Sequence, residues 1–178
     1  AKQVMSSRSF GSRVNTIQDL EQAISYHAAN AGERLRKHGL YANLVYVFIQ
    51  NSPFDKAQYY GASRVVALPS PTDCTLQITR VALWLLKQIY KEGIYYQKAG
   101  VMLMELVPAS GQQTDLFSSE ATATKKSNLM ATLDSINRKY SKGTIKLASE
   151  GTEKVWVMRR NYKSPSYTSD WNELPTVC

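Results

Sequence analysis

The chain has 178 residues, of which 43% are apolar and 20% are charged. This composition predicts one folded domain with room for a small appendage, and it excludes a disordered polar chain. Lysine and arginine outnumber the acidic residues by 22 to 14, and the net charge of +8 points to an anionic partner such as nucleic acid. No apolar run approaches a membrane span and the start does not resemble a signal peptide, so we expect a cytoplasmic protein with no membrane partner.

The two cysteines, Cys74 and Cys178, form no C-x-x-C pair. Their spacing predicts free thiols in a reducing compartment. The chain begins with Ala1 rather than Met, which suggests a fragment or a processed chain. In that case, the activity of the parent protein need not lie within these residues.

The first predicted elements are a short strand at 4–10, which Gly11 ends, and a long helix. Thr16 can cap this helix, and Asp19 can return a hydrogen bond to Thr16 and favours the positive end of the helix. Gly39 is a natural stop. The apolar face of the helix recurs at steps of three and four residues and consists of Ile17, Leu20, Ile24, Ala28, Ala31 and Leu35.

Two β-rich runs, 44–49 and 63–68, predict the next strands. Thr72 or Asp73 can cap a second helix, and residues 97–107 predict a long fourth strand. The apolar face of the second helix consists of Ile78, Val81, Ala82, Leu85, Leu86 and Ile89.

The order strand-helix-strand, strand-helix-strand predicts an α+β fold for a first domain at 1–108. It corresponds to the split β-α-β-β-α-β arrangement, a four-stranded sheet with two helices on one face. The other face of the sheet is left open. In a basic protein, such an open face is available for binding.

The remainder of the chain predicts a linker at 109–126 and a small α/β subdomain at 127–178. The residues of the linker are polar and small, and they show no helical or strand periodicity. The helix of the subdomain carries Leu129, Leu133, Ile136 and Tyr140. Two strands, 144–148 and 154–158, are predicted to meet at a hairpin turn formed by Glu150, Gly151 and Thr152.

The linker contains Gln113-Thr114-Asp115-Leu116-Phe117. An exposed Leu-Phe pair without other apolar support predicts docking into a pocket of another protein. The Gln-x-x-Leu-Phe pattern resembles the peptide by which bacterial DNA polymerases and repair factors hold the sliding clamp.

Hydroxyl and basic groups recur at the strands of the first domain. Such groups suit phosphate oxygens, because arginine binds them in a bidentate manner and serine by a single bond. Glycine lets a phosphate approach the backbone closely. We therefore predict a DNA-binding surface that comprises Ser7, Arg8, Ser9, Arg13, Ser63, Arg64, Lys98 and Gly100. The simpler alternative for residues 6–9 is a solvated edge strand.

Strand alternation leaves the placement of Arg8 open. Arg8 has the same parity as Val4 and Phe10, so a regular strand puts all three on one face. Either a bulge intervenes or the open face is partly apolar.

The sequence predicts no catalytic residue, metal site or cofactor. Neither His27 nor His38 stands at metal-ligand spacing from a Cys, Asp or Glu, and His27 is interpreted as packing at the helix surface or core edge. No carboxylate pair follows a strand, and no phosphate loop or nucleophile elbow is present. The tyrosines could stack on the bases of single-stranded nucleic acid. They are scattered along the chain, however, which favours half-buried packing in strands and loops.

Several stretches of the chain resemble the UmuC-type Y-family DNA polymerases, in order and over nearly the whole length. KQVMSSRSFG at 2–11 is similar to the start of their little-finger domain, and YQKAGVML at 96–103 to its last strand. QTDLF at 113–117 stands where that family carries its clamp peptide. The stretches that resemble its C-terminal region are TIKL at 144–147, WVMRR at 156–160 and SPSYT at 164–168.

The resemblance implies a translesion polymerase of the SOS response that acts in SOS mutagenesis and DNA repair. In that family the little finger grips primer–template duplex through its sheet, and a palm, absent from this chain, holds Mg²⁺ on carboxylates. Clamp docking is implied for Gln113, Asp115, Leu116 and Phe117, with Thr114 where Leu is frequent. A processed UmuD-like dimer and the RecA filament are further implied partners.

A different class remains open, namely a protein-interaction or regulatory module with incidental basic charge. Trp156 and Trp171 could then anchor the tail on another subunit. The simpler alternative for Trp156 is a place in the core of a small packed subdomain. A basic open sheet face would favour DNA, whereas a negative face or one covered by the tail would favour the interaction module.

Overall fold

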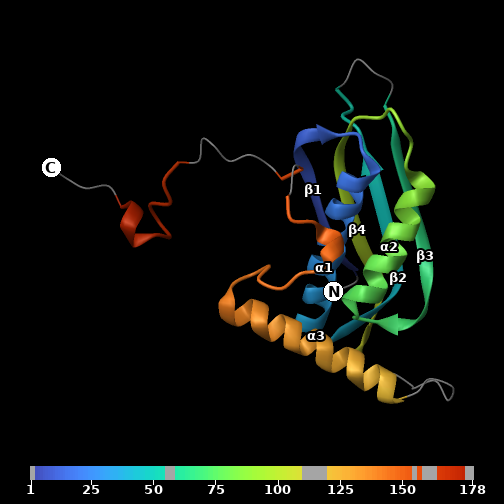
Figure 1. Ribbon diagram of the computed structural model, residues 1–178, viewed down its shortest axis with the longest axis vertical. Helices are drawn as coiled ribbons and strands as arrows, with labels where there is room; N and C mark the ends of the chain where they lie inside the picture. Colours follow the sequence, from blue (N-terminus) through green and yellow to red (C-terminus); the bar gives the residue numbers. More distant parts are fainter. Residues whose placement is uncertain (1–2, 55–58, 110–119, 154–155, 158–163, 175–178) are drawn as a thin grey trace.

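The computed structural model describes residues 3–54, 59–109, 120–153, 156–157 and 164–174. Within them the chain forms a four-stranded sheet, three α-helices and two short 3-10 helices (Figure 1). The strands are β1 (Gln3–Val14), β2 (Leu40–Gln50), β3 (Gly61–Thr72) and β4 (Tyr96–Pro108). The helices are α1 (Ile17–Lys37), α2 (Thr75–Ile89), α3 (Glu120–Tyr140), η2 (Ala148–Glu150) and η3 (Trp171–Glu173). In these described segments, no helix is long and apolar enough to cross a membrane.

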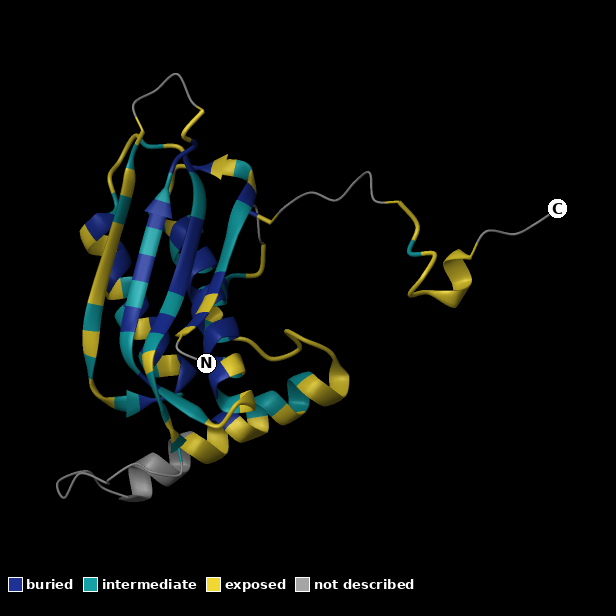
Figure 2. Ribbon diagram, turned by 180° about the vertical axis from the view of Figure 1, so that it is seen from behind, coloured by how far each residue is buried: buried dark blue, intermediate teal, exposed yellow. Residues whose placement is uncertain are grey.

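The strand order of the sheet is β1-β4-β2-β3, and each neighbouring pair is antiparallel. β1 and β2 therefore run parallel with β4 between them, and β3 and β4 run parallel with β2 between them. α1 and α2 cover one face of the sheet (Figure 1), and Figure 2 shows the sheet from the opposite side. The split β-α-β-β-α-β sheet and the α+β class predicted from the sequence are confirmed.

α1 begins and ends where the sequence predicts. The Thr16 hydroxyl accepts a hydrogen bond from the Asp19 backbone N–H at 3.2 Å and donates one to the Asp19 carboxylate at 2.6 Å. The chain leaves the helix through Gly39, whose φ of +62° favours glycine. The fully buried residues of its apolar face are Leu20, Ile24, Ala28, Ala31 and Leu35.

α2 has a different start from the predicted one. Cys74 occupies the N-cap position, without a side-chain cap bond. The Thr72 hydroxyl instead accepts from the Cys74 N–H at 3.1 Å, so it supports the backbone before the helix. Thr72 is the last residue of β3, because that strand continues through Pro69 and Pro71 beyond its predicted end. A register shift opposite 42–44 accommodates the prolines, which an edge strand tolerates.

The helix that follows the predicted linker begins earlier than predicted, and the predicted tail hairpin is wrong. α3 already begins at Glu120, so the last part of the expected linker, 109–126, is helical. Residues 144–148 form no strand, and the chain enters η2 rather than a hairpin. The part of the second predicted strand outside 156–157 lies outside the described residues.

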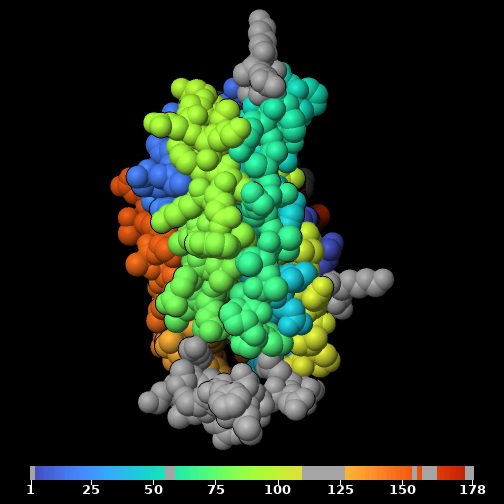
Figure 3. All heavy atoms as spheres, turned by 90° about the vertical axis from the view of Figure 1, so that its right-hand side faces the viewer, coloured from blue at the N-terminus to red at the C-terminus, as the bar shows by residue number. Residues whose placement is uncertain are grey.

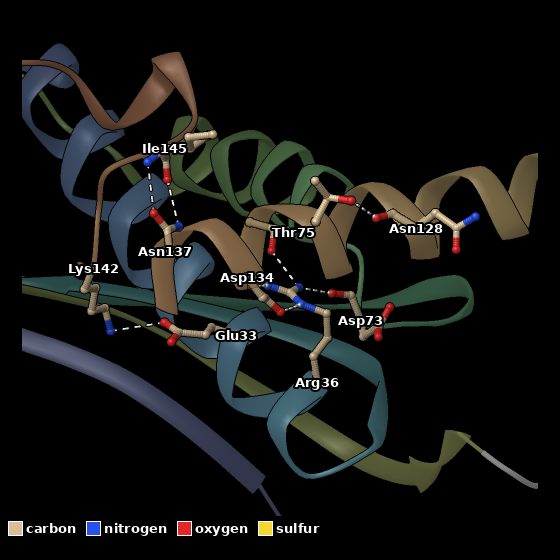
Figure 4. Close-up of polar contacts among 10 residues, drawn as sticks. Glu33, Arg36, Asp73, Thr75, Asn128, Asp134, Asn137, Lys142 and Ile145 are labelled. Carbon is tan, nitrogen blue, oxygen red and sulfur yellow. Dashed lines mark hydrogen bonds and ion pairs between the residues drawn. The ribbon is translucent and has the colours of Figure 1, made fainter. Parts of the chain in front are cut away.

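The side chain of Asn137 occupies the backbone of Ile145, in the middle of the predicted strand 144–148. Its Oδ1 atom accepts from the Ile145 N–H, and its Nδ2 group donates to the Ile145 carbonyl, each at 2.9 Å (Figure 4). The amide on α3 therefore takes both positions that a partner strand would occupy. Such a contact has no periodic signal in the sequence.

α3 is held to the first domain by Arg36 of α1. The guanidinium donates to both oxygens of Asp134, at 2.6 and 2.8 Å, and to the Asp73 carbonyl at 2.7 Å and the Thr75 hydroxyl at 2.8 Å (Figure 4). Both charged side chains are largely shielded from solvent. Such a bidentate, part-buried pair is stronger and more directional than an exposed ion pair.

Trp156 fixes the tail to the middle of α1, and only 1% of its surface is exposed. Its ring centroid lies 6.3 Å from that of Phe10, 5.3 Å from that of Tyr26 and 6.1 Å from that of His27. The Gly11 N–H donates to its carbonyl at 3.2 Å. Trp156 is therefore a core residue and is unavailable as an anchor for another subunit, whereas Trp171 is 88% exposed.

Replacing Trp156 with Ala should lower the free energy of unfolding by about 3–5 kcal/mol, because the change leaves a cavity beneath α1. Urea denaturation monitored by circular dichroism measures this loss. Trp171→Ala is the matched control, since that ring is exposed, and it should change stability by less than about 0.5 kcal/mol. Equal effects of the two variants would contradict the core role of Trp156.

Candidate nucleic-acid interface

The face of the sheet opposite the helices carries most of the predicted binding residues. Along β2, the fully buried residues Val45, Val47 and Ile49 face the helices, and the residues between them face the other side. In Figure 2 no described segment crosses the centre of this open face. The tail therefore does not cover it in the described part of the chain.

Strand pairing brings the predicted polar residues together on this open face. Directly opposite residues of antiparallel strands share a face. One row across the four strands consists of Ser7, Gly100, Phe48 and Ser63. The adjacent row consists of Ser9, Lys98, Gln50 and Gly61. Two hydroxyl groups and one ammonium group thus lie on the neighbouring strands β1 and β4.

Arg8 and Arg64 lie on the other side of the sheet from these residues. Arg8 is opposite Ala99, and Arg64 is opposite Val47, both of which are fully buried beneath the helices. The register shift in β1 comes after Ser9, so the alternation is regular through Arg8. Both arginines sit on edge strands, where a guanidinium can reach solvent around the rim. Arg13 lies within the irregular stretch between Ser9 and Val14 and is exposed.

The parity of Arg8 left either a bulge or a partly apolar open face, and neither places Arg8, because Arg8 and Val4 both lie on the helix side. The centre of the open face is nevertheless apolar, through other residues. The row beyond Ser7 consists of Met5, Met102, Tyr46 and Val65. Met5 and Val65 are about half exposed, and the other two are partly exposed. The sequence signal for this apolar row was the alternation of its residues with the buried valines along each strand, which places them on the opposite face.

Gly100 has a packing role that the sequence did not predict. A Cβ atom at this position would lie 2.5 Å from an atom of the Phe48 ring and 2.5 Å from the Ser7 Cβ atom. The expected open approach to the backbone is therefore corrected, because these side chains fill that space. Lys98 lies beside them, with its ammonium nitrogen 5.9 Å from the Phe48 ring centroid, within range of a cation–π contact.

His27 and Ser6 form a buried pair that superficially resembles a nucleophile and its base. The Ser6 hydroxyl and the His27 Nδ1 atom lie 3.0 Å apart, and Trp156 packs beside the imidazole. Burial, followed by the charges of Arg8 and Arg34, lowers the pKa of His27 from 6.5 to about 4. The pair is closed to solvent, so it holds strand β1 against α1 and cannot meet a substrate. The prediction that His27 packs is confirmed.

In the part of the chain that the structure describes, no group of three or more His, Cys, Asp or Glu could hold a metal ion. The predicted clamp-binding residues Gln113, Asp115, Leu116 and Phe117 lie outside the described residues.

Comparison with known proteins identifies two family regions. Residues 1–116 match the impB/mucB/samB family C-terminal domain, and residues 127–177 match a domain of unknown function, DUF4113. Curated relatives include Protein UmuC of Salmonella typhimurium, 37% identical over 99% of this chain and 42% of that protein. Protein MucB of Escherichia coli is 38% identical over 98% of this chain and 41% of that protein. The resemblance to UmuC-type proteins is confirmed, and the chain spans less than half the length of these relatives.

Among solved structures, the insertion ternary complex of Dbh DNA polymerase aligns with 60% of this chain and 29% of that chain. The TM-score is 0.49 and the sequence identity is 11%. This likeness is too distant to bear on function.

The buried imidazole predicts a loss of stability in acid. Above pH 6.5 His27 is neutral in both the folded and unfolded chain, whereas between pH 6.5 and about 4 only the unfolded chain binds the proton. The folded state should therefore lose about 3 kcal/mol over this window. Urea unfolding of the wild type and His27→Gln, near pH 7 and at about pH 4.5, measures the effect. On going from pH 7 to pH 4.5, the wild type should lose more unfolding free energy than His27→Gln does. An equal loss in both proteins would contradict the buried neutral imidazole.

Proposed function

Because the chain belongs to the impB/mucB/samB family, we propose that it is the DNA-gripping and clamp-docking part of an error-prone translesion polymerase of the SOS response. The observation that carries this proposal is the open sheet face, on which Ser7, Ser9 and Lys98 come together on adjacent strands. The catalytic carboxylates and Mg²⁺ of the parent enzyme would belong to the part of the relatives that this chain does not span. Such a polymerase works on cytoplasmic DNA.

The arrangement of these groups suits the backbone of a duplex. Side chains directly opposite one another on antiparallel strands have Cβ atoms about 5 Å apart, so the Ser9 hydroxyl and the Lys98 ammonium can bind one phosphate. Ser7 lies two residues away from Ser9 on the same face of β1, and its hydroxyl can bind the next phosphate along the DNA strand. Phosphate contacts position a protein without reading sequence, which is what a polymerase needs on any template.

The clamp peptide adds a second attachment to the same DNA. Gln113, Leu116 and Phe117 follow β4, the last strand of the domain. A ring on the duplex would meet this peptide at a high effective concentration, so weak intrinsic affinity would suffice. A processed UmuD-like dimer and the RecA filament are proposed partners whose contacts we do not assign to residues.

The alternative function is a protein-interaction or regulatory module. The apolar centre of the open face, around Met5 and Val65, is the observation that favours it, because such a surface also suits a protein partner. Burial of Trp156 removes one of the two anchors on which this alternative depended. The open face carries Lys98 and is not covered by the described tail, so we prefer DNA.

Duplex binding should weaken steeply as salt rises, because each neutralised phosphate releases counterions. Lys98→Ala should reduce the slope of log affinity against log salt by about 1 and weaken binding to all sequences alike. Fluorescence anisotropy with a labelled primer–template measures both. Lys139→Ala, on the exposed face of α3, is the control and should leave the slope unchanged. An isotherm indifferent to salt would rule out the phosphate-binding face.

Replacing Leu116 and Phe117 together with Ala should abolish binding to a bacterial sliding clamp, since the pair is expected to fill its apolar pocket. Surface plasmon resonance with immobilised clamp provides the measurement. Ser118→Ala combined with Ser119→Ala is the matched control within the same stretch and should bind normally. The peptide assignment is wrong if the Leu116 and Phe117 double variant retains native affinity.

A further inference from the structure

The outer faces of the two helices that cover the sheet differ in one respect. On α1, Trp156 packs against Tyr26 and His27, and η2 with its buried Glu150 also contacts this helix. α2 retains an exposed stripe of residues at helical spacing, and Figure 3 shows α2 and β3 side by side on this surface with no described part of the tail over them. Leu76 is 41% exposed and Trp84 is 55% exposed. Tryptophan is enriched at binding interfaces, where its indole supplies a large apolar surface.

Cations flank this indole along one line. Arg80 and Lys87 are exposed and lie one turn to either side of Trp84, about 6 and 4.5 Å along the helix axis. α2 contains no acidic residue. Arg64 is exposed on the helix side of the adjacent strand β3.

A further cation and aromatic ring lie at the C-terminal end of α2, where the half-buried Tyr60 packs against Tyr96. The Tyr60 hydroxyl donates to the Ile89 carbonyl at 2.7 Å, which places its ring at this end of the helix. The Lys91 ammonium lies 4.8 Å from the centroid of that ring. Two carboxylates are nearby, since Glu92 is exposed and Glu21 lies 3.6 Å from the Lys87 ammonium. Cations remain in excess over carboxylates.

We propose that this surface, the basic-aromatic track, binds single-stranded nucleic acid. The basic-aromatic track comprises Arg64, Arg80, Trp84, Lys87, Lys91 and Tyr60. A base stacks on the exposed indole, and the phosphates on either side meet the cations one turn away. Stacking accepts any base, because each presents a π-face. The sequence signal was the position of Trp84 outside the apolar helix face.

A single strand fits this surface better than an acidic peptide does. Arg80 separates Leu76 from Trp84, so a protein interface that covered both apolar groups would also bury the guanidinium and lose its hydration. A nucleic-acid strand brings a phosphate to the same guanidinium while it stacks on the indole. The chemistry of the track therefore favours a polyanion with flat apolar groups.

The basic-aromatic track and the proposed duplex site lie on opposite sides of the sheet, and β3 is the edge between them. Val65 and Ser63 face the open side, whereas Arg64 faces the helix side. A single strand that leaves a duplex at this edge can therefore pass around β3 onto α2. Binding at the two sites should be separable by mutation.

Tryptophan fluorescence tests the proposal with a short oligothymidylate as the probe. The chain has three tryptophans, and Trp156 is buried, so Trp171→Phe leaves Trp84 as the exposed indole. Addition of the oligonucleotide to the Trp171→Phe protein should quench this fluorescence. Trp84→Ala should lower affinity about 5- to 150-fold, as expected for the loss of one stacked base. Arg80→Glu should bind the oligonucleotide more weakly than the wild type, because it replaces attraction by repulsion. The difference in affinity between the two proteins should grow as salt is lowered, because screening is then weaker.

Matched controls separate this proposal from the duplex proposal. Trp171→Ala removes an indole that is even more exposed than Trp84 but lies outside the track, and it should leave oligothymidylate affinity unchanged. Lys98→Ala should affect only primer–template duplex, and Trp84→Ala should affect only the single strand, with unchanged urea midpoints confirming folding. Unquenched Trp84, native affinity of Trp84→Ala, or quenching by an oligoglutamate peptide but not by oligothymidylate would each overturn the proposal.

Discussion

The placement of α3 on the rest of the structure depends on a single guanidinium, that of Arg36. It joins three parts of the chain that are distant in sequence: the end of α1, the turn that leads from β3 into α2 through Asp73 and Thr75, and α3 through Asp134. The position of Gly32 makes room for it, since a Cβ there would lie 3.3 Å from Arg36 Nη1 and 2.9 Å from the Thr75 hydroxyl. Directional donors in a fixed plane explain why arginine, and not lysine, suits this junction.

This junction and the Trp156 contact place the tail on α1, and that placement determines which surfaces stay free. The centre of the sheet face opposite the helices and the outer side of α2 are the two large areas that the described tail does not cover. One presents hydroxyl groups and Lys98 around an apolar centre, and the other presents Trp84 between cations. The two proposed sites would allow this protein to hold two forms of nucleic acid at once.

The sequence predicted those parts of the fold that follow from local periodicity. Leu20 and Ile24 repeat with the helical period, and Val45 and Val47 alternate as strand residues do, so burial could be inferred. The packing role of Gly100 could not, because it depends on Phe48 and Ser7 standing opposite it on two other strands. Likewise, the tail hairpin was predicted from β-rich composition, whereas the amide of Asn137 satisfies the backbone there. Contacts that depend on register or on one distant side chain leave no repeating signal.

The burial of Trp156 affects how copies of the protein that lack the tail would be recognised in the cell. The indole covers Phe10, Tyr26 and His27, which belong to the region matched by the first family, whereas Trp156 belongs to the second. A molecule that has lost its tail through proteolysis or a premature stop codon would expose these rings as a contiguous apolar patch. Chaperones and proteases act on such surfaces, so quality control would remove truncated copies and leave intact ones in place.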